Sequence, residues 1–236
     1  MEIELLIILI TLFVGSLIQT TIGFGAGIIA TPILYMVSPE TVPFFVSFVF
    51  MILCICILYI NRFHFVLGEL IFAVIFRIPG TIVGAWLLMI ISQQILALII
   101  GISVLMAVVI SIFNISIGVN RGSMAIAGFF SGIMGTIAAI GGPPIVLLMQ
   151  NEDAGKLKAG LAFFFTISSI MSLIAQWWVG KVPTIPTGWW LLSILAVILG
   201  FLSGRWFSAR FRSEWLRPVI LSLCGISGLS VITQVF

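Results

Sequence analysis

Long apolar runs separated by short polar breaks dominate the chain, and most of the runs have the length of a membrane-spanning helix. An α-helix rises about 1.5 Å per residue, so about 20 residues cross the hydrocarbon core of a bilayer. The alternating strands of a membrane β-barrel are a different pattern. The runs predict spans at 3–21, 41–60, 66–91, 94–113, 123–140, 159–179, 188–207 and 215–236.

Two further apolar runs, 28–37 and 145–150, are too short to span, and each follows a glycine-rich break. The second break ends in Pro143 and Pro144, which disfavour a continuous helix. Broken helices at membrane depth are tolerated only where they are buried in protein or line a watery cavity. The sequence therefore predicts two short helices held inside the protein.

The composition agrees with a membrane location. Hydrophobic residues make up 62% of the chain and charged residues 7%, whereas soluble domains carry about 25% charged residues. This excludes a soluble enzyme, a nucleic-acid binder and a disordered chain. We predict an all-α polytopic membrane protein that is surrounded by lipid and has no nucleic-acid partner. One histidine and three cysteines in apolar surroundings predict no zinc site, and no cofactor is expected.

The two halves of the chain resemble each other. The pattern Gly-x3-Gly-x-Trp at 80–86 recurs at 200–206, and the pair 25–26 in the first break corresponds to 141–142 in the second. A single pair of small residues is common in membrane helices, but matching pairs in matching places indicate an internal duplication.

The basic residues decide how often the chain crosses the membrane. If each break lies within one long span, the chain crosses eight times, with three cations on one side of the membrane and five on the other. If each short run is its own crossing or a deep hairpin arm, the chain crosses ten times. Seven of the cations then lie on one side of the membrane and only Lys181 lies on the other, as the positive-inside rule expects. We therefore predict two inverted repeats of about five crossings each, 1–116 and 117–236, with both termini on the non-cytoplasmic side.

The breaks are the predicted binding site. A short helix after a break offers free N–H groups and a positive dipole end, where an anion binds readily. The alternative is that the glycines only permit close helix packing. The candidate residues in and before the breaks are Gln19, Thr20, Thr21, Gly23, Phe24, Gly25, Gly27, Gly135, Thr136, Gly141, Gly142 and Pro143.

Arg77 is the second element of the predicted site. It lies eleven residues into the span 66–91, about 16 Å deep at 1.5 Å per residue. A charge there faces protein or a water-filled cavity, and a guanidinium suits a carboxylate, sulfonate or phosphate. The alternative is a structural arginine bonded to backbone carbonyls. The second repeat has Val197 at the matching position, and Ser47 and Thr166 are added as polar candidates at corresponding depths.

Catalytic motifs are missing from the sequence. It contains no H-E-x-x-H, no G-x-S-x-G and no nucleotide-binding loop, and its acidic residues fall at segment ends. Neither an enzyme nor a self-contained primary pump is predicted. We assign Ser168, Ser169 and Gln176 to helix–helix hydrogen bonds.

The segment 23–32, GFGAGIIATP, resembles the glycine-rich signature of the TauE/SafE sulfite exporter family. The pair Ser131-Gly132, followed by Gly135 and by Gly141-Gly142-Pro143, resembles its second copy, and the pattern Pro79-Gly80-x3-Gly84 also fits. The chain departs from the richest form of the signature at Ala26 and Ala139. The resemblance implies a carrier, in a bacterial or archaeal cytoplasmic membrane, for small sulfur-containing anions such as sulfite, sulfonates or thiosulfate.

Several expectations stay open at this point. In a secondary transporter, one repeat would move against the other around a midplane anion site. The same residues could instead line an anion channel, or the chain could be a non-catalytic membrane subunit. A homodimer is an open alternative to a monomer.

Overall fold

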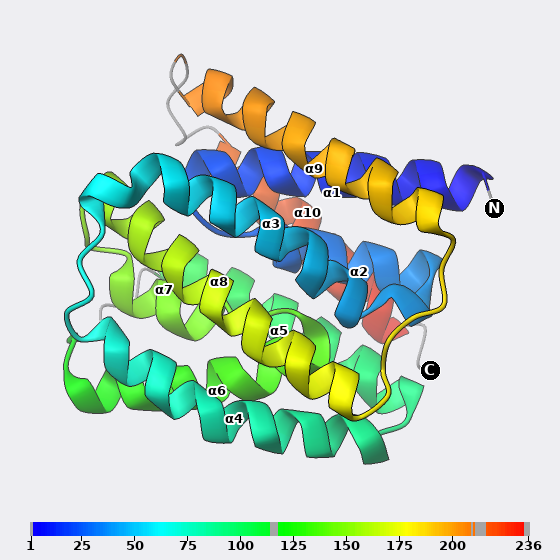
Figure 1. Cartoon of the computed structure of the whole chain (residues 1–236), viewed down its shortest axis with the longest axis horizontal. Coiled ribbons are helices and arrows are strands. Elements are labelled where there is room, and N and C mark those ends of the chain that lie inside the picture. The colour runs from blue at the N-terminus through cyan, green and yellow to red at the C-terminus, as the bar shows by residue number, and fades with distance from the viewer. Residues whose placement is uncertain (1, 114–117, 209, 211–215, 234–236) are drawn as a thin grey trace.

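The computed structural model describes residues 2–113, 118–208, 210 and 216–233, and over these residues the chain is helical without a strand. The predicted all-α fold is therefore confirmed (Figure 1). The α-helices are α1 (Glu2–Ile22), α2 (Ala26–Val37), α3 (Phe44–Asn61), α4 (Leu70–Ile90), α5 (Gln93–Phe113), α6 (Arg121–Ala138), α7 (Pro143–Met149), α8 (Ala154–Trp178), α9 (Thr187–Ser208) and α10 (Leu216–Thr233).

Five of the described helices, α1, α3, α4, α8 and α9, are long and apolar enough to cross a membrane. The two helices that follow the breaks are not. With 12 residues in α2 and 7 in α7, they extend about 18 Å and about 10 Å, less than the roughly 30 Å hydrocarbon core. Of the two arrangements left open by the sequence, their lengths fit short hairpin arms rather than complete crossings.

The helices adjoining the breaks end for local reasons. Gly23 and Gly25 adopt φ angles of 106° and 111°, in the left-handed region that favours glycine. In the second break Ala139 occupies the same region, with a φ of 56°. Positions 23 and 139 correspond when the first repeat is shifted by 116 residues onto the second. Both breaks thus begin with the same backbone reversal, and only the second is made by a residue with a side chain.

Corresponding helices of the two repeats pack in corresponding ways. Helix α4 packs along α6, and α9 packs along α1. Gly80 of α4 faces the carbonyl oxygen of Phe129, while Gly200 of α9 faces the carbonyl oxygen of Phe13. Each glycine lets two helix backbones approach closely, as small residues do in membrane bundles. The same interface is therefore built twice, as a duplication predicts. The boundary at 116 lies outside the described residues.

One end of the bundle gathers the starts of α4, α6 and α8. Arg121 at the start of α6 lies 3.8 Å from Glu69 just before α4. Gly23, directly after α1, faces the side chain of Lys158 near the start of α8. Helix α1 therefore ends where α6 begins, so these two corresponding helices run in opposite directions. The N-terminus lies at the opposite end, with the loop between α8 and α9 (Figure 1).

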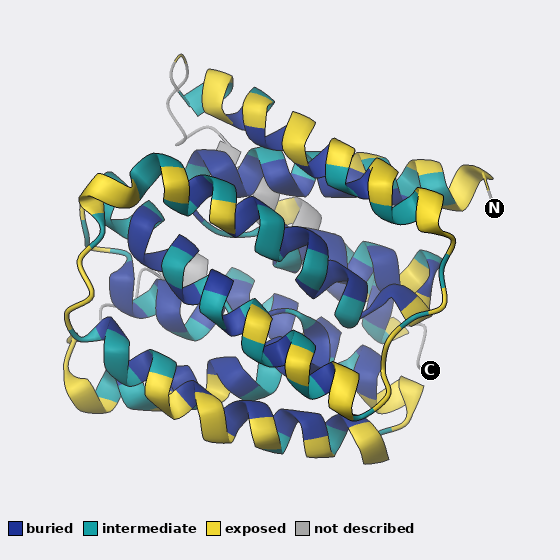
Figure 2. Ribbon diagram, in the orientation of Figure 1, coloured by how far each residue is buried: buried dark blue, intermediate teal, exposed yellow. Residues whose placement is uncertain are grey.

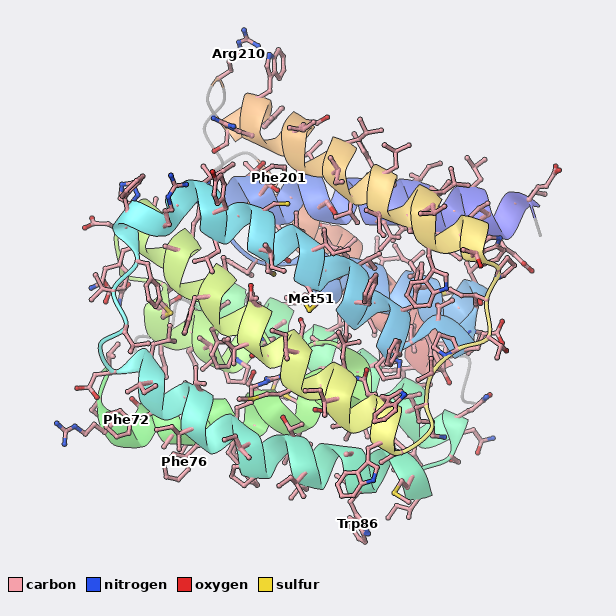
Figure 3. All side chains as sticks on the ribbon, viewed as in Figure 1. Met51, Phe72, Phe76, Trp86, Phe201 and Arg210 are labelled. Atoms are coloured by element: carbon pink, nitrogen blue, oxygen red, sulfur yellow. The ribbon has the colours of Figure 1, made fainter. Side chains whose placement is uncertain are left out.

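The outer surface of the bundle is apolar. Helices α4 and α9 alternate buried and exposed positions, with the exposed positions facing outward (Figure 2). Phe76 and Trp86 point away from α4 (Figure 3) and are 45% and 59% exposed. An apolar surface of this extent is typical of contact with lipid.

Candidate anion-binding site

The two breaks meet inside the bundle. A Cβ built on Gly27 of the first break would lie 2.7 Å from the carbonyl oxygen of Ala139 in the second, so glycine is required by the contact itself. Between the breaks and the facing helices α3 and α8 lies a cavity of about 70 Å³. One water needs roughly 10–15 Å³ on this measure. The cavity has room for a small anion or several waters.

The cavity brings together nine of the fifteen candidate residues and leaves six out. The residues on its wall are Gln19, Phe24, Gly25, Gly27, Ser47, Arg77, Gly135, Gly141 and Gly142. The candidates that do not line it are Thr20, Thr21, Gly23, Thr136, Pro143 and Thr166.

Each excluded candidate contacts other protein groups. Thr136 Oγ1 of α6 lies 3.2 Å from Ser172 Oγ of α8. Thr20, Thr21 and Thr166 donate their hydroxyls to the carbonyl four residues earlier in their own helices, at 2.7, 2.8 and 2.7 Å. This back-bonding satisfies a threonine inside a helix. Gly23 faces the start of α8 instead of the cavity. Pro143 is buried as the first residue of α7.

Arg77 lies at one wall of the cavity and is 2% exposed. Its Nη1 donates to Ser131 Oγ at 2.8 Å, and its Nη2 donates to Ser172 Oγ at 3.0 Å. Nη2 also approaches the carbonyl of Ser168 at 3.4 Å, whereas Nε has no partner within the described residues. These bonds hold the guanidinium in place with neutral groups, and they leave its charge uncompensated.

Two glycines make room for this guanidinium. A Cβ on Gly135 would lie 2.5 Å from Arg77 Nη2, and one on Gly141 would lie 3.1 Å from Nη1. Ser131 accepts from Arg77 and donates to the carbonyl of Gly141. The glycines thus admit the arginine to the second break. This is a different role from the direct anion contact predicted from the sequence.

Arg77 lies nearer one end of its helix than the sequence predicts. Residues 66–69 lie outside the helix, with a turn at 68–69, and α4 begins at Leu70. Arg77 is seven residues further on, about 10 Å along the axis at 1.5 Å per residue, where the sequence predicted 16 Å. It is therefore displaced toward the basic end of the bundle.

The two breaks differ in the free backbone N–H groups that they present. At the start of α2, Gly25, Gly27 and Ile28 line the cavity. The amide of Ala26 donates to Gln19 Oε1 at 3.2 Å, and the amides of Gly27 and Ile28 belong to a first turn that has no partner within the helix.

The start of α7 has no free donors of this kind. Pro143 and Pro144 have no N–H, and the amides of Ile145 and Val146 both donate to the carbonyl of Gly142. The prediction that both short helices present free N–H groups is therefore wrong for α7, because its first turn consists of prolines and satisfied amides.

Several residues of the site were not assigned to it from the sequence: Ser168 was assigned to helix–helix hydrogen bonds, and Ser131 only to the family signature. Ser131 and Ser172 anchor Arg77, and Ser168, whose hydroxyl is buried without a partner, lines the cavity. Ser168 and Ser172 are four residues apart, so they share one face of α8. That spacing was the feature of the sequence from which their shared position could have been predicted. Cys54 also lines the cavity and accepts a hydrogen bond from Gln19 Nε2 at 3.2 Å.

An all-α membrane bundle with two broken hairpins around a buried cation is the architecture of a membrane transporter. The family model described as Sulfite exporter TauE/SafE matches residues 7–231, and the chain belongs to that family. No curated protein and no solved structure matches it. The family is one of transporters, which agrees with the prediction that the chain is not an enzyme.

Proposed function

We propose that this protein is a secondary carrier that exports small sulfur-containing anions, of the sulfite, sulfonate and thiosulfate class, through the cavity between the breaks. One observation carries the proposal. Arg77 lies buried beside the cavity and has no carboxylate partner among the described residues.

The charge of Arg77 favours an anionic ligand. A buried cation without a counter-charge is costly in a medium of low dielectric constant, and neutral hydrogen-bond partners offset only part of that cost. An anion in the cavity supplies the missing charge. The guanidinium fork fits the oxygens of a sulfonate or sulfite group, and charge-assisted hydrogen bonds of this kind are short and strong.

Neutral donors around the cavity complete the proposed site. The amides of Gly27 and Ile28 begin a helix at the cavity wall, and Arg77 Nε and the Ser168 hydroxyl are buried there without a partner. We expect these groups to turn toward the oxygens of a bound anion. The first break would thus contribute backbone donors, and Arg77 of α4, held beside the second break through Ser131, would contribute a side-chain cation. Arg77, Gly27 and Ile28 belong to the first repeat and Ser168 belongs to the second, so the anion would contact residues of both repeats.

We propose that transport alternates the exposure of this cavity, with a revision of which parts move. Helices α4, α6 and α7 share an apolar core with the start of α8, and α1 packs with α2 and α9. Each of these groups contains helices from both repeats. The moving bodies would therefore be these two mixed groups, rather than the first repeat against the second.

The proposed location is a bacterial or archaeal cytoplasmic membrane, with the basic end of the bundle toward the cytoplasm. A membrane potential that is negative inside favours export of an anion by about 2.3 kcal/mol per charge per 100 mV. The potential alone can therefore drive export, and a separate coupling ion is not required.

Transport by purified protein in liposomes tests the proposal. Labelled sulfite uptake should saturate and should accelerate when unlabelled sulfite is present on the opposite side, because a carrier exchanges substrate. A channel would show conductance without either property. Arg77→Ala should abolish uptake, while Arg121→Ala, at the exposed end of α6, should leave it unchanged. Undiminished uptake by Arg77→Ala would overturn the proposal.

A further inference from the structure

The wall of the cavity carries a single positive charge. Among the described residues that line it, Arg77 is the one cation, and no lining residue is a carboxylate. The nearby Lys158 does not line the cavity, since its side chain packs against Gly23 and its Nζ donates to Ser208 Oγ at 3.3 Å.

The duplication explains why the charge is single. Arg77 corresponds to Val197 of the second repeat under the shift of 120 residues that superposes Gly80 on Gly200. Its neighbour Gly135 corresponds to Gln19 under the shift of 116 residues that relates the breaks. Arg77 and Gly135 therefore correspond to Val197 and Gln19, of which Gln19 lines the cavity whereas Val197 is buried in the apolar core. The duplicated scaffold therefore has one cationic position, at Arg77, and one corresponding neutral position.

The neutral position is occupied by the side chain of Gln19. Gln19 accepts from the amide of Ala26 with Oε1 at 3.2 Å and donates to Cys54 Sγ from Nε2 at 3.2 Å. The glutamine occupies the position where the other half leaves space at Gly135 for a guanidinium. A second negative charge on a ligand would meet this amide–thiol pair and the phenyl ring of Phe50 instead of a cation.

We infer that the carrier selects singly charged anions, and this inference rests on the proposed function. A singly charged oxyanion neutralises Arg77 and leaves the occupied site without net charge. A doubly charged anion leaves one negative charge buried at membrane depth, which costs on the order of a hundredfold in affinity. Hydrogensulfite and sulfonates are thus substrates, whereas the sulfite dianion, sulfate and thiosulfate are excluded, which narrows the proposed class by removing thiosulfate.

A consequence concerns the membrane potential. The occupied site is neutral and the empty site carries the charge of Arg77, so the potential acts on the return of the empty carrier. Exchange of one anion for another avoids that return. Exchange should therefore be insensitive to voltage, while net export should depend on it.

Competition for labelled sulfite uptake into liposomes containing the full chain tests the inference. The probes are methanesulfonate, which is singly charged throughout the working pH range, and the dianions sulfate and thiosulfate. Methanesulfonate should compete, with the dianions about a hundredfold weaker. Sulfite uptake should fall as pH rises through its second ionisation, while methanesulfonate uptake stays constant. Equal competition by sulfate and methanesulfonate would overturn the inference and leave the proposed function standing. Failure of every probe to be transported would overturn both.

A variant provides an independent gain-of-function test. Gln19→Gly combined with Val197→Arg reproduces the arginine–glycine pair on the neutral side, with Gln19→Gly alone as the matched control. The double variant should improve competition by sulfate relative to methanesulfonate at least tenfold. A folded double variant that rejects sulfate as strongly as the control does would contradict the charge-counting argument. Should the variant not reach the membrane, the wild-type comparison decides.

Discussion

Arg77 and Ser131 are joined by a 2.8 Å hydrogen bond from Nη1 to Oγ, which ties α4 to α6 at the wall of the cavity. Ser131 has no exposed surface, and its hydroxyl also donates to the carbonyl of Gly141 in the second break. One serine thus connects the buried cation to the reversal of the chain. A movement of the break would be transmitted to the guanidinium, and a change in the guanidinium would be transmitted to the break.

Ser131→Ala should weaken anion binding while the protein still folds. Hydrogen bonds to charged groups contribute about 1.5–3 kcal/mol, so the KM for sulfite should rise tenfold or more. Ser172→Ala, which removes only the second anchor, should have a smaller effect. Ser230→Ala in α10, whose hydroxyl bonds to its own helix, is the control. A KM unchanged by Ser131→Ala would show that the bond does not position Arg77.

Gly135→Ala should impair transport more strongly than a serine variant does. The new Cβ would lie 2.5 Å from Arg77 Nη2, so the guanidinium must move. Labelled uptake should fall by at least tenfold, with the protein still recovered from the membrane. Gly225→Ala in α10 is the matched control, because no atom lies within 4 Å of its added Cβ. Equal activity of the two variants would contradict the packing argument.

The helices and breaks could be predicted because their signals are local. Pro143 and Pro144 have no N–H to donate, so they occupy the first turn of α7 and preclude a helix continuous with α6. Each apolar run indicates its own length. Duplication was also readable, since Gly80 and Gly200 recur in matching patterns.

The partners of Arg77 could not be predicted in the same way. Ser131 and Ser172 are 54 and 95 residues away from it in the chain, and only the packing of α4 against α6 and α8 brings them close. The role of Gly135 was hidden for the same reason. A glycine in a sequence does not indicate whether a ligand, a neighbouring helix or a guanidinium occupies the space beside it.

Cys54 should report occupancy of the site. Its thiol lines the cavity, whereas Cys56, two residues further along α3, does not. Variants that retain only one of these cysteines should both react with a small thiol reagent, and bound anion should slow the reaction at Cys54 alone. The measurement is the labelling rate with and without saturating sulfonate. Equal protection at Cys56 would indicate a general change in conformation rather than an occupied cavity.

The orientation of the bundle predicts where impermeant reagents reach it. In a cysteine-free background, Lys181→Cys should react with an impermeant maleimide in intact cells, because the loop between α8 and α9 lies at the end of the bundle that carries the N-terminus. Glu152→Cys, before α8, should react only after permeabilisation. Similar labelling of both positions in intact cells would contradict the inverted arrangement.

Ala139→Gly should stabilise the protein. Ala139 adopts a φ of 56° and a ψ of 19°, and the left-handed conformation costs a residue with a Cβ about 1–2 kcal/mol. Glycine removes that cost but adds conformational freedom to the unfolded chain, so the net gain should be about 1 kcal/mol. The neighbouring Ala138→Gly is the control. Residue 138 is the last in α6 and has ordinary helical geometry, so glycine there should destabilise by at least about 0.5 kcal/mol. Thermal unfolding of the two variants in the same detergent, without anion, should therefore move in opposite directions. A lower melting temperature for Ala139→Gly would mean that the methyl group of Ala139 contributes more through packing than its backbone conformation costs.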